Sequence, residues 1–347
     1  FHAEDGIRDS STSRGLGDVY KRQNLMRDHG QKGMPLQALS GVDIALWDIA
    51  GKAANLPLYK MIGGAHRDKV EVYGYGMMLR PENINSLISR FKEESAEIKE
   101  MGFKALKMKV GVGPKDDIKL IEAVREGIGD NFRFMVDANH GYTTHDALYV
   151  GRAMEEFSPY WFEEPVAPED LDGYRELRAF LKVNISGGEA EFNRWGWRKL
   201  LESRGLDIAQ PEVCALGGIS EYLRVLALCH SHFTPVVNHV WGSAIAVAVN
   251  LHLLAAMPPL PGGLFPWEPM LEFDTTHNHF IDDLLTVSLD IKNQVKNNNG
   301  TVSLPNGPGL GVTPQRDFLD KFRDKFGEAY SAVEKQIEKK PWGGYGV

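Results

Sequence analysis

The chain is poor in cysteine, in positive charge and in long apolar runs, and each shortage excludes a class of protein. Two cysteines, Cys214 and Cys229, are too few for a disulfide framework and lack metal-site spacing, which is typical of a reducing compartment. A net charge of −8 argues against nucleic acid or an anionic membrane as the main partner. Asn250 and His252 interrupt the stretch that comes nearest to a membrane span, residues 242–257, so it predicts a buried helix. We expect a cytoplasmic protein that binds neither nucleic acid nor membrane.

The beginning of the chain also lacks any helical or strand period. Residues 1–23 are polar and rich in glycine, serine and arginine. Such a segment cannot bury an apolar face. We expect a non-native or disordered tail here, and the predicted fold begins at residue 24.

From about residue 68, short β-rich runs alternate with amphipathic helical stretches. This repeated alternation indicates parallel strands joined by helical crossovers. Eight strands with seven helices between them favour a closed α/β barrel of the TIM type. A doubly wound open sheet is the alternative, but no glycine fingerprint of the dinucleotide-binding kind follows the first strand. The predicted strands are residues 70–76, 103–110, 133–139, 160–166, 183–190, 206–212, 233–241 and 263–269.

Polar side chains recur at or near the carboxyl ends of these predicted strands, about one strand–helix unit apart. In a barrel, these ends meet at one mouth, where active sites are built. A single charged strand end usually has no chemical role, but a whole series in register is difficult to explain in that way. The series consists of Lys109, Asp137, Glu163, Glu189, Glu212, His239 and Glu268.

Three of these residues, Asp137, Glu163 and Glu189, are carboxylates on consecutive strands, with no histidine or cysteine among them. Carboxylates that face one another repel unless a cation neutralises them. An all-oxygen set suits a hard ion, so Mg²⁺ is predicted first and Mn²⁺ second. Glu163 and Glu164 point to opposite faces of their strand, and spacing alone does not decide which of the two is a ligand.

Three further residues, a lysine pair and a histidine, suit acid–base chemistry. Lys107 and Lys109 face the same side of a strand, so each is expected to lower the pKa of the other and to make a general base available. The alternative is a pair of ion-pair partners for the carboxylates. His239 would be oriented by Glu212, although a histidine in an apolar strand is more often a core residue. The histidines of the CHSHF and THNHF segments are interpreted as surface features.

At these residues the chain resembles the enolase superfamily, specifically its mandelate racemase subgroup, over approximately residues 24–322. The Lys-x-Lys motif of that subgroup corresponds to KMK, and its metal-ligand segments correspond to MVDAN, FEEP and GGEAE. The implied roles are metal binding by Asp137, Glu163 and Glu189, acid–base catalysis by Lys109 and His239 with Glu212 as the partner of the histidine, and substrate binding by Lys107, Asn139 and Glu268.

The resemblance also implies a (β/α)7β barrel, a modified TIM barrel, over residues 67–270. Residues 24–66 would be the remnant of an α+β capping domain, and residues 271–347 would pack back on it. The chain departs from the subgroup in having Glu212 where aspartate is usual, which leaves the strength of the histidine–acid dyad open. It also lacks most of the cap, whose lid loops cover substrate, so the chain as written is expected to be poorly active. A homo-oligomer, a dimer or an octamer, is implied.

The activity implied is removal of the proton α to the carboxylate of a small-molecule substrate. We expect dehydration of an aldonate or aldarate to a 2-keto-3-deoxy acid, because Asn139, His140 and Glu191 near the strand ends suit a polyhydroxy acid. Racemisation or epimerisation of a 2-hydroxy acid shares the proton abstraction and is the alternative. A non-catalytic truncated barrel is a third possibility.

Overall fold

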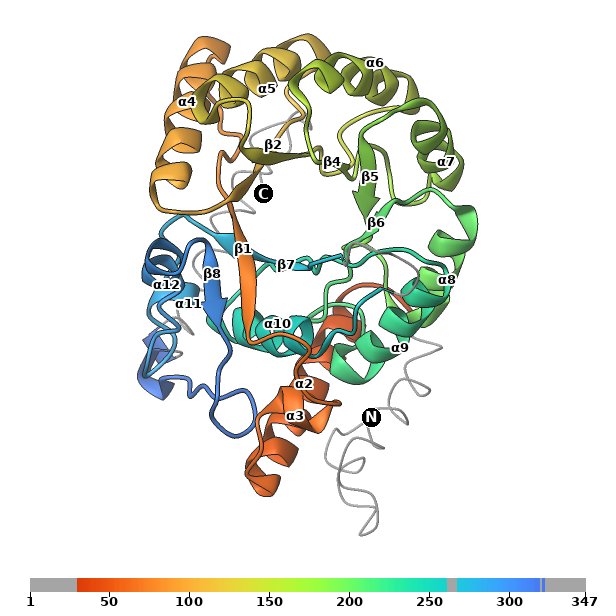
Figure 1. Cartoon of the computed structure of the whole chain (residues 1–347). Helices are drawn as coiled ribbons and strands as arrows, with labels where there is room; N and C mark the ends of the chain where they lie inside the picture. Colours follow the sequence, from red (N-terminus) through yellow and green to blue (C-terminus); the bar gives the residue numbers. More distant parts are fainter. Residues whose placement is uncertain (1–29, 261–266, 319, 322–347) are drawn as a thin grey trace.

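The computed structural model describes residues 30–260, 267–318 and 320–321, which form a ring of strands with helices outside it (Figure 1). The predicted tail, residues 1–23, lies outside the described residues. The strands are β1 (Lys69–Tyr75), β2 (Ala105–Lys109), β3 (Arg133–Asp137), β4 (Trp161–Glu163), β5 (Asn184–Gly187), β6 (Ile208–Ala209), β7 (Met270–Asp274) and β8 (Thr301–Ser303).

The strands are paired in the order β6-β5-β4-β3-β2-β1-β7, and each neighbouring pair in this order is parallel. The prediction of a curled α/β sheet of the barrel type is confirmed. Strand β8 pairs antiparallel with β1, which the alternating pattern does not predict. The helices are α2 (Met34–Ala54), α3 (Leu58–Met61), α4 (Ile84–Glu100), α5 (Pro114–Ile128), α6 (Thr144–Met154), α7 (Leu171–Phe180), α8 (Asn193–Ser203), α9 (Gly218–Ser231), α10 (Ala244–Ala256), α11 (His279–Asp282) and α12 (Ile291–Asn297), with a 3-10 turn at Glu155–Phe157.

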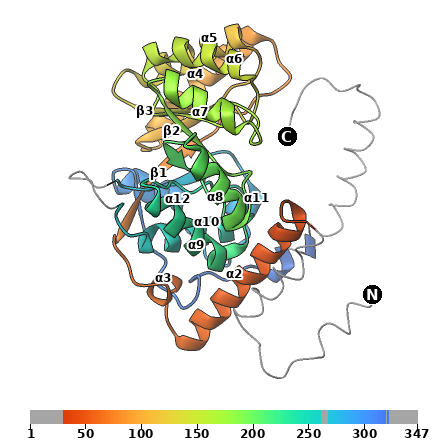
Figure 2. The same ribbon diagram turned by 90° about the vertical axis from the view of Figure 1, so that its right-hand side faces the viewer.

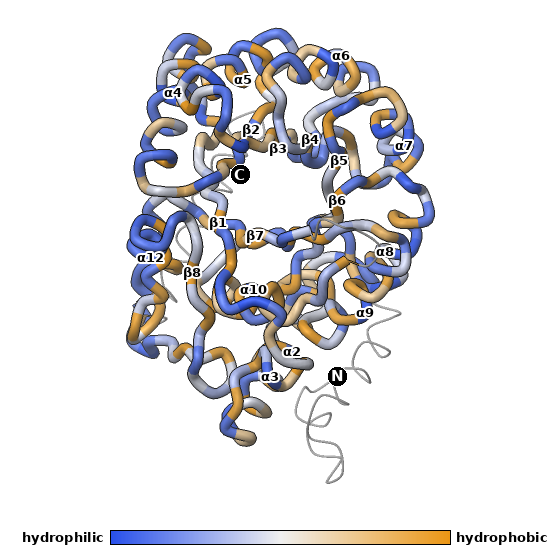
Figure 3. Tube along the Cα trace, viewed as in Figure 1, coloured by the Kyte–Doolittle hydropathy of each residue, from blue (hydrophilic) through white to orange (hydrophobic). Residues whose placement is uncertain are grey.

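Helices α4 to α7 are amphipathic, and hydrophobic and hydrophilic positions alternate around them (Figure 3). Several begin at a side-chain cap directly after the loop that leaves a strand. The side chains of Asn83, Thr143 and Asp170 each accept a hydrogen bond from a backbone N–H in the first turn of α4, α6 and α7. Because each helix starts at a fixed residue, the loop at the carboxyl end of the preceding strand is held in place.

The predicted seventh strand, residues 233–241, is extended beside β6 but contains no assigned strand. Ala209 donates to Pro235 O at 2.9 Å and accepts from Val237 N at 3.0 Å. On the side that faces β7, the backbone N–H of Val240 donates to the carboxylate of Glu272 at 2.9 Å. A side chain therefore replaces part of the sheet ladder next to this segment.

Asn238 anchors the same segment to the helices behind it. This fully buried amide accepts a hydrogen bond from the Tyr222 hydroxyl of α9 at 2.7 Å and donates to Asn250 Oδ1 of α10 at 2.7 Å. Asn250, one of the two polar residues that interrupt the apolar 242–257 stretch, thus has a structural role, and the prediction of a buried helix there is confirmed. No helix of the described residues is long and apolar enough to cross a membrane.

Of the predicted eighth strand, residues 263–269, the structure describes residues 267–269, and these do not belong to a strand. Residues 261–266 lie outside the described residues. The last parallel strand is β7, which pairs with β1 and begins at Met270, so it continues beyond residue 270, the predicted end of the barrel. Pro269 has no N–H to give to a ladder, so it marks the start of the strand rather than its end.

The short N-terminal capping segment lies on the outside of the barrel, where α2 runs alongside α9 (Figure 2). The buried carboxylate of Asp43 accepts from the backbone N–H and the hydroxyl of Ser220 at 2.9 and 2.6 Å. The segment after β8 returns to the same region, where Leu310 N donates to Asp48 Oδ1 at 2.8 Å and Gly309 N to Leu56 O at 2.9 Å.

Candidate active site

The three predicted metal ligands lie together at the carboxyl ends of β3, β4 and β5. Asp137 and Glu163 are register partners, and Glu189 follows the end of β5 by two residues. One oxygen from each of the three carboxylates lies within 4.8 Å of the other two. This all-oxygen donor set fits a hard divalent cation such as Mg²⁺.

The two lysines of β2 reach into this cluster from one side. Lys107 is 1% exposed, and its ammonium lies 2.5 Å from Glu163 Oε1, 2.6 Å from Glu272 Oε1 and 3.4 Å from Asp137 Oδ2. Lys109 contacts Asp137 Oδ2 and donates to Asn139 Oδ1 at 2.6 Å. Both lysines therefore face the mouth, as their spacing predicts.

The expected lowering of the lysine pKa values is outweighed by the carboxylates. Burial lowers the pKa of Lys109, and Lys107 lowers it further, but the charge of Asp137 raises it above the ordinary value. The pKa of Lys107 is lowered by burial and then raised well above its usual range by Glu163 and Glu272. Both lysines are thus held as ammonium groups by the acids around them.

His239 approaches the carboxylate cluster through Glu189. Its Nε2 lies 3.0 Å from Glu189 Oε2, and its Nδ1 lies 2.9 Å from Glu212 Oε2. Burial lowers the pKa of His239, but the negative charge of Glu189, followed by that of Glu272, raises it well above the ordinary value. The longer glutamate arm at position 212 reaches the histidine, and its oxygens also accept from the backbone N–H groups of Cys214 and Trp241 at 2.8 and 3.2 Å.

The prediction that Glu268 faces the mouth is wrong. Its side chain is 64% exposed and pairs with Arg67 at 3.3 Å, two residues before β7 begins. The glutamate that this strand contributes to the site is Glu272, which is 1% exposed and contacts Lys107. The sequence feature that could have identified Glu272 is its position as the third residue of MLEFD, the run that follows Pro269.

Asn139 is placed as expected, in the turn that follows β3. Its backbone has a φ of 40°, its N–H donates to Asp137 Oδ1 at 2.9 Å, and its side chain accepts from Lys109. His140, the next residue, also has a positive φ, and its Nε2 lies 3.1 Å from the buried carboxylate of Glu164. Glu164 therefore has an ion-pair partner outside the cluster of three carboxylates.

Two models of known families match the chain. A model described as enolase C-terminal domain-like matches residues 90–318, which is more than half of the sequence. A model of the mandelate racemase/muconate lactonizing enzyme N-terminal domain matches residues 15–63 and so begins inside the segment expected to be a tail. The chain belongs to the enolase superfamily.

Several relatives within this superfamily resemble the chain over most of its length. It is 42% identical over 300 residues to the D-galactarolactone cycloisomerase of Agrobacterium fabrum, a match that covers 86% of this chain and 77% of the relative. It is 33% identical over 297 residues to the arabinonate dehydratase of Saccharolobus solfataricus, covering 85% and 74% of the two chains. The crystal structure of L-talarate dehydratase from Polaromonas sp. JS666, complexed with Mg and L-glucarate, superposes with a TM-score of 0.72 at 27% identity over 89% of this chain and 79% of that one.

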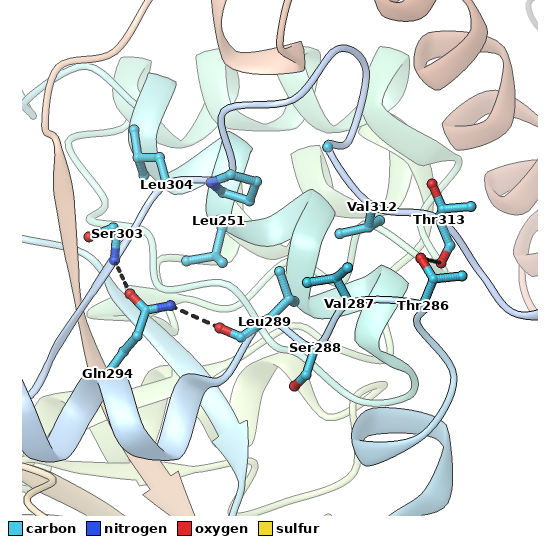
Figure 4. A pocket seen from close by; sticks show the side chains of 12 residues that line it. Leu251, Thr286, Val287, Ser288, Leu289, Gln294, Ser303, Leu304, Val312 and Thr313 are labelled. Atoms are coloured by element: carbon cyan, nitrogen blue, oxygen red, sulfur yellow. Dashed lines mark hydrogen bonds between the residues drawn. The ribbon is translucent and has the colours of Figure 1, made fainter.

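A separate cavity of about 270 Å³ in this superfamily member lies beside α10 and α12 (Figure 4). Leu251, Val287 and Val312 supply much of its apolar wall. The side-chain amide of Gln294 is already bonded to the backbone of Leu289 and Ser303. None of the predicted site residues lines this cavity, so it is not part of the candidate active site.

Proposed function

We propose that this enzyme removes the proton α to the carboxylate of a sugar acid and then eliminates the oxygen on the β-carbon. The observation that supports this best is the position of the two acid–base residues. Lys109 contacts Asp137 and His239 contacts Glu189, so the two groups approach one cluster of three carboxylates through different members of it. A substrate bound at this cluster would have a proton-transfer group on each side.

The proposed metal is Mg²⁺, with Mn²⁺ as the second choice, held by Asp137, Glu163 and Glu189. When bound, such an ion supplies positive charge that stabilises the enolate form of the substrate. We assign the binding of the substrate carboxylate to Lys107, supported by Glu272, and a contact to a substrate hydroxyl to Asn139. These assignments rest on the convergence of the side chains at one mouth.

The proposed reaction balances with two proton transfers. With the charges of Asp137 and Glu189 offset by a bound cation, the pKa of Lys109 and of His239 would be lower, so that one of them could be neutral. That residue would take the α-proton, and the electron pair of the broken C–H bond would form the enolate. The C–O bond at the β-carbon then breaks, and the departing oxygen takes a proton from the other residue of the pair. When that oxygen is a free hydroxyl it leaves as water, and the enol product tautomerises to a 2-keto-3-deoxy acid. The enzyme is then a dehydratase of an aldonate or aldarate.

A second candidate, cycloisomerisation of a sugar lactone, is favoured by the 42% identity to a galactarolactone cycloisomerase. If the β-oxygen belongs to a lactone ring, the same elimination opens the ring and the product is an isomer of the substrate. Both candidates are lyase reactions that need the same α-proton abstraction. They differ only in the leaving oxygen.

The mass of the product separates the two candidates. The Mg²⁺-loaded protein would be incubated with a panel of aldonates, aldarates and their lactones, with EDTA as the control, and the products analysed by mass spectrometry and proton NMR. Dehydration gives a product lighter by one water from an open-chain acid. Cycloisomerisation gives a product of unchanged mass from a lactone. Inversion of the α-carbon with no elimination product would contradict the proposal and indicate a racemase.

A further inference from the structure

The carboxylate of Glu163 is held from inside the barrel by two neutral donors that have no role in the proposed reaction. Trp161 Nε1 donates to Glu163 Oε2 at 2.8 Å, and Gln210 Nε2 donates to the same oxygen at 2.7 Å. The two side chains are 0% and 1% exposed, so water does not compete for these bonds. We propose that Trp161 and Gln210 are positioning residues that determine which oxygen Glu163 presents to the metal.

The hydrogen-bonding capacity of the carboxylate supports this assignment. A carboxylate has about four acceptor positions, roughly two on each oxygen. Trp161 and Gln210 occupy both positions of Oε2, whereas Oε1 has one hydrogen-bond contact within the described part of the chain, the Lys107 ammonium at 2.5 Å. Oε1 therefore retains a free position, and it is the oxygen available to a cation. This inference rests on the proposed metal site, but not on the reaction carried out there.

The two donors are placed by the sheet itself. Trp161 and Glu163 are two residues apart on β4 and point to the same face, toward the barrel interior. Gln210 follows β6 directly, and its backbone N–H donates to Gly187 O of β5 at 2.9 Å. Trp161 is thus held by its strand and the backbone of Gln210 by its bond to β5, so the two donors fix the orientation of Glu163 before any ligand binds.

Tyr73 provides a matched control in the same layer. It lies on β1, is 0% exposed and packs edge-on against Trp161 with ring centroids 5.6 Å apart. Its hydroxyl has no hydrogen-bond partner among the described residues. Tyr73→Phe thus removes a buried polar atom without removing a bond, whereas Trp161→Phe removes the N–H that holds Glu163. Gln210→Met removes the second donor at similar volume.

The test is the dissociation constant of Mg²⁺ or Mn²⁺ alone, measured by calorimetry on the wild-type protein and the three variants. Loss of a hydrogen bond that orients a metal ligand typically weakens binding about 10- to 100-fold, and we expect this for Trp161→Phe and for Gln210→Met. The dissociation constant of Tyr73→Phe should stay within about twofold of the wild-type value, since this variant loses no hydrogen bond to a metal ligand. Thermal melts in EDTA verify that each variant is folded and separate weaker metal binding from a general loss of stability.

The proposal is overturned if folded Trp161→Phe and Gln210→Met bind the cation as tightly as Tyr73→Phe does. A wild-type protein that binds neither ion overturns it as well, together with the metal site. Wild-type protein that binds metal but does not turn over sugar acids contradicts only the proposed function. The two failures are therefore distinguishable.

Discussion

Lys107 connects the acids of the site, because its ammonium contacts two glutamates from different strands, Glu163 and Glu272. A buried charge of this kind is tolerated only when opposite charges and hydrogen bonds satisfy it. Glu272 serves twice in this role, since its second oxygen accepts the N–H of Val240, one residue after His239. Removing its charge should therefore disturb both the lysine side and the histidine side of the site.

We expect Glu272→Gln to lower kcat/KM on the physiological sugar acid by about 10- to 100-fold, the usual range for residues that orient metal and substrate ligands. Glu268→Gln should leave kcat/KM within about twofold, because that side chain is exposed and distant from the cluster in the barrel. Steady-state kinetics on the two variants tests this directly. Equal losses at both positions would show that Glu272 is not the residue that matters on this strand.

Among the elements, the 233–241 segment positions His239 although it contains no assigned strand. Its side-chain anchor is Asn238, bonded to Tyr222 and Asn250. Asn238→Ala leaves both partners buried with an unmade bond, and each such group costs about 1–3 kcal/mol of unfolding free energy. Tyr222→Phe breaks one bond only and should cost less. Urea unfolding compares the two, and the account is contradicted if Tyr222→Phe is the more destabilising.

His252 of α10 is bonded to two other segments of the chain, and its protonation should weaken the fold. Its Nδ1 accepts from the N–H of Tyr59 in α3 at 3.3 Å, and its Nε2 lies 3.1 Å from Leu310 O in the return segment. Burial lowers the pKa of His252 to about 4, despite a bond to Leu310 O that acts to raise it. In the unfolded chain a histidine has a pKa of about 6.5. The folded protein thus favours the neutral ring of His252 more strongly than the unfolded chain does.

The stability from His252 should be fully present above pH 6.5 and be lost as the pH falls toward 4. This difference in pKa between the folded and the unfolded chain corresponds to roughly 3 kcal/mol of unfolding free energy at most. As the pH is lowered between these limits, the free energy of unfolding should fall more steeply for the wild type than for His252→Gln. The exposed His145 supplies the control, and His145→Gln should retain the wild-type slope. Equal slopes for the wild type and His252→Gln would contradict this role.

The sequence predicts most of these elements because strand–helix alternation and amphipathic helices are local patterns. It fails where a long-range contact decides the structure. The last parallel strand starts at Met270 only because Pro269 cannot join the ladder with β1, and this displaces the site glutamate from Glu268 to Glu272. Strand β8 exists only by pairing with β1, and the hydrogen bonds of Gln210 and Trp161 to Glu163 depend on strands that meet inside the barrel.

At the scale of the whole molecule, the barrel brings carboxylates from three strands close enough to repel one another. Burial raises the pKa of Glu163 to about 7, and the nearby charge of Asp137 raises it while Lys107 lowers it. A divalent cation relieves this repulsion in the folded chain only. Saturating Mg²⁺ at about 100 times its dissociation constant should add about 2.7 kcal/mol to the free energy of unfolding. Calorimetric melts should show a rise in Tm that EDTA reverses, and a Tm insensitive to Mg²⁺ would contradict the metal site.

We propose that Lys109 and His239 transfer protons to and from one sugar acid bound between them. The most direct measurement is proton NMR in D₂O with Mg²⁺, which follows the α-proton of the substrate in the wild type, in Lys109→Met and in His239→Asn. We predict that the wild type replaces this proton with deuterium and forms the elimination product, that both variants lose turnover, and that at least one also stops exchanging the proton. A wild type that turns over substrate while both variants retain exchange and turnover would contradict the account.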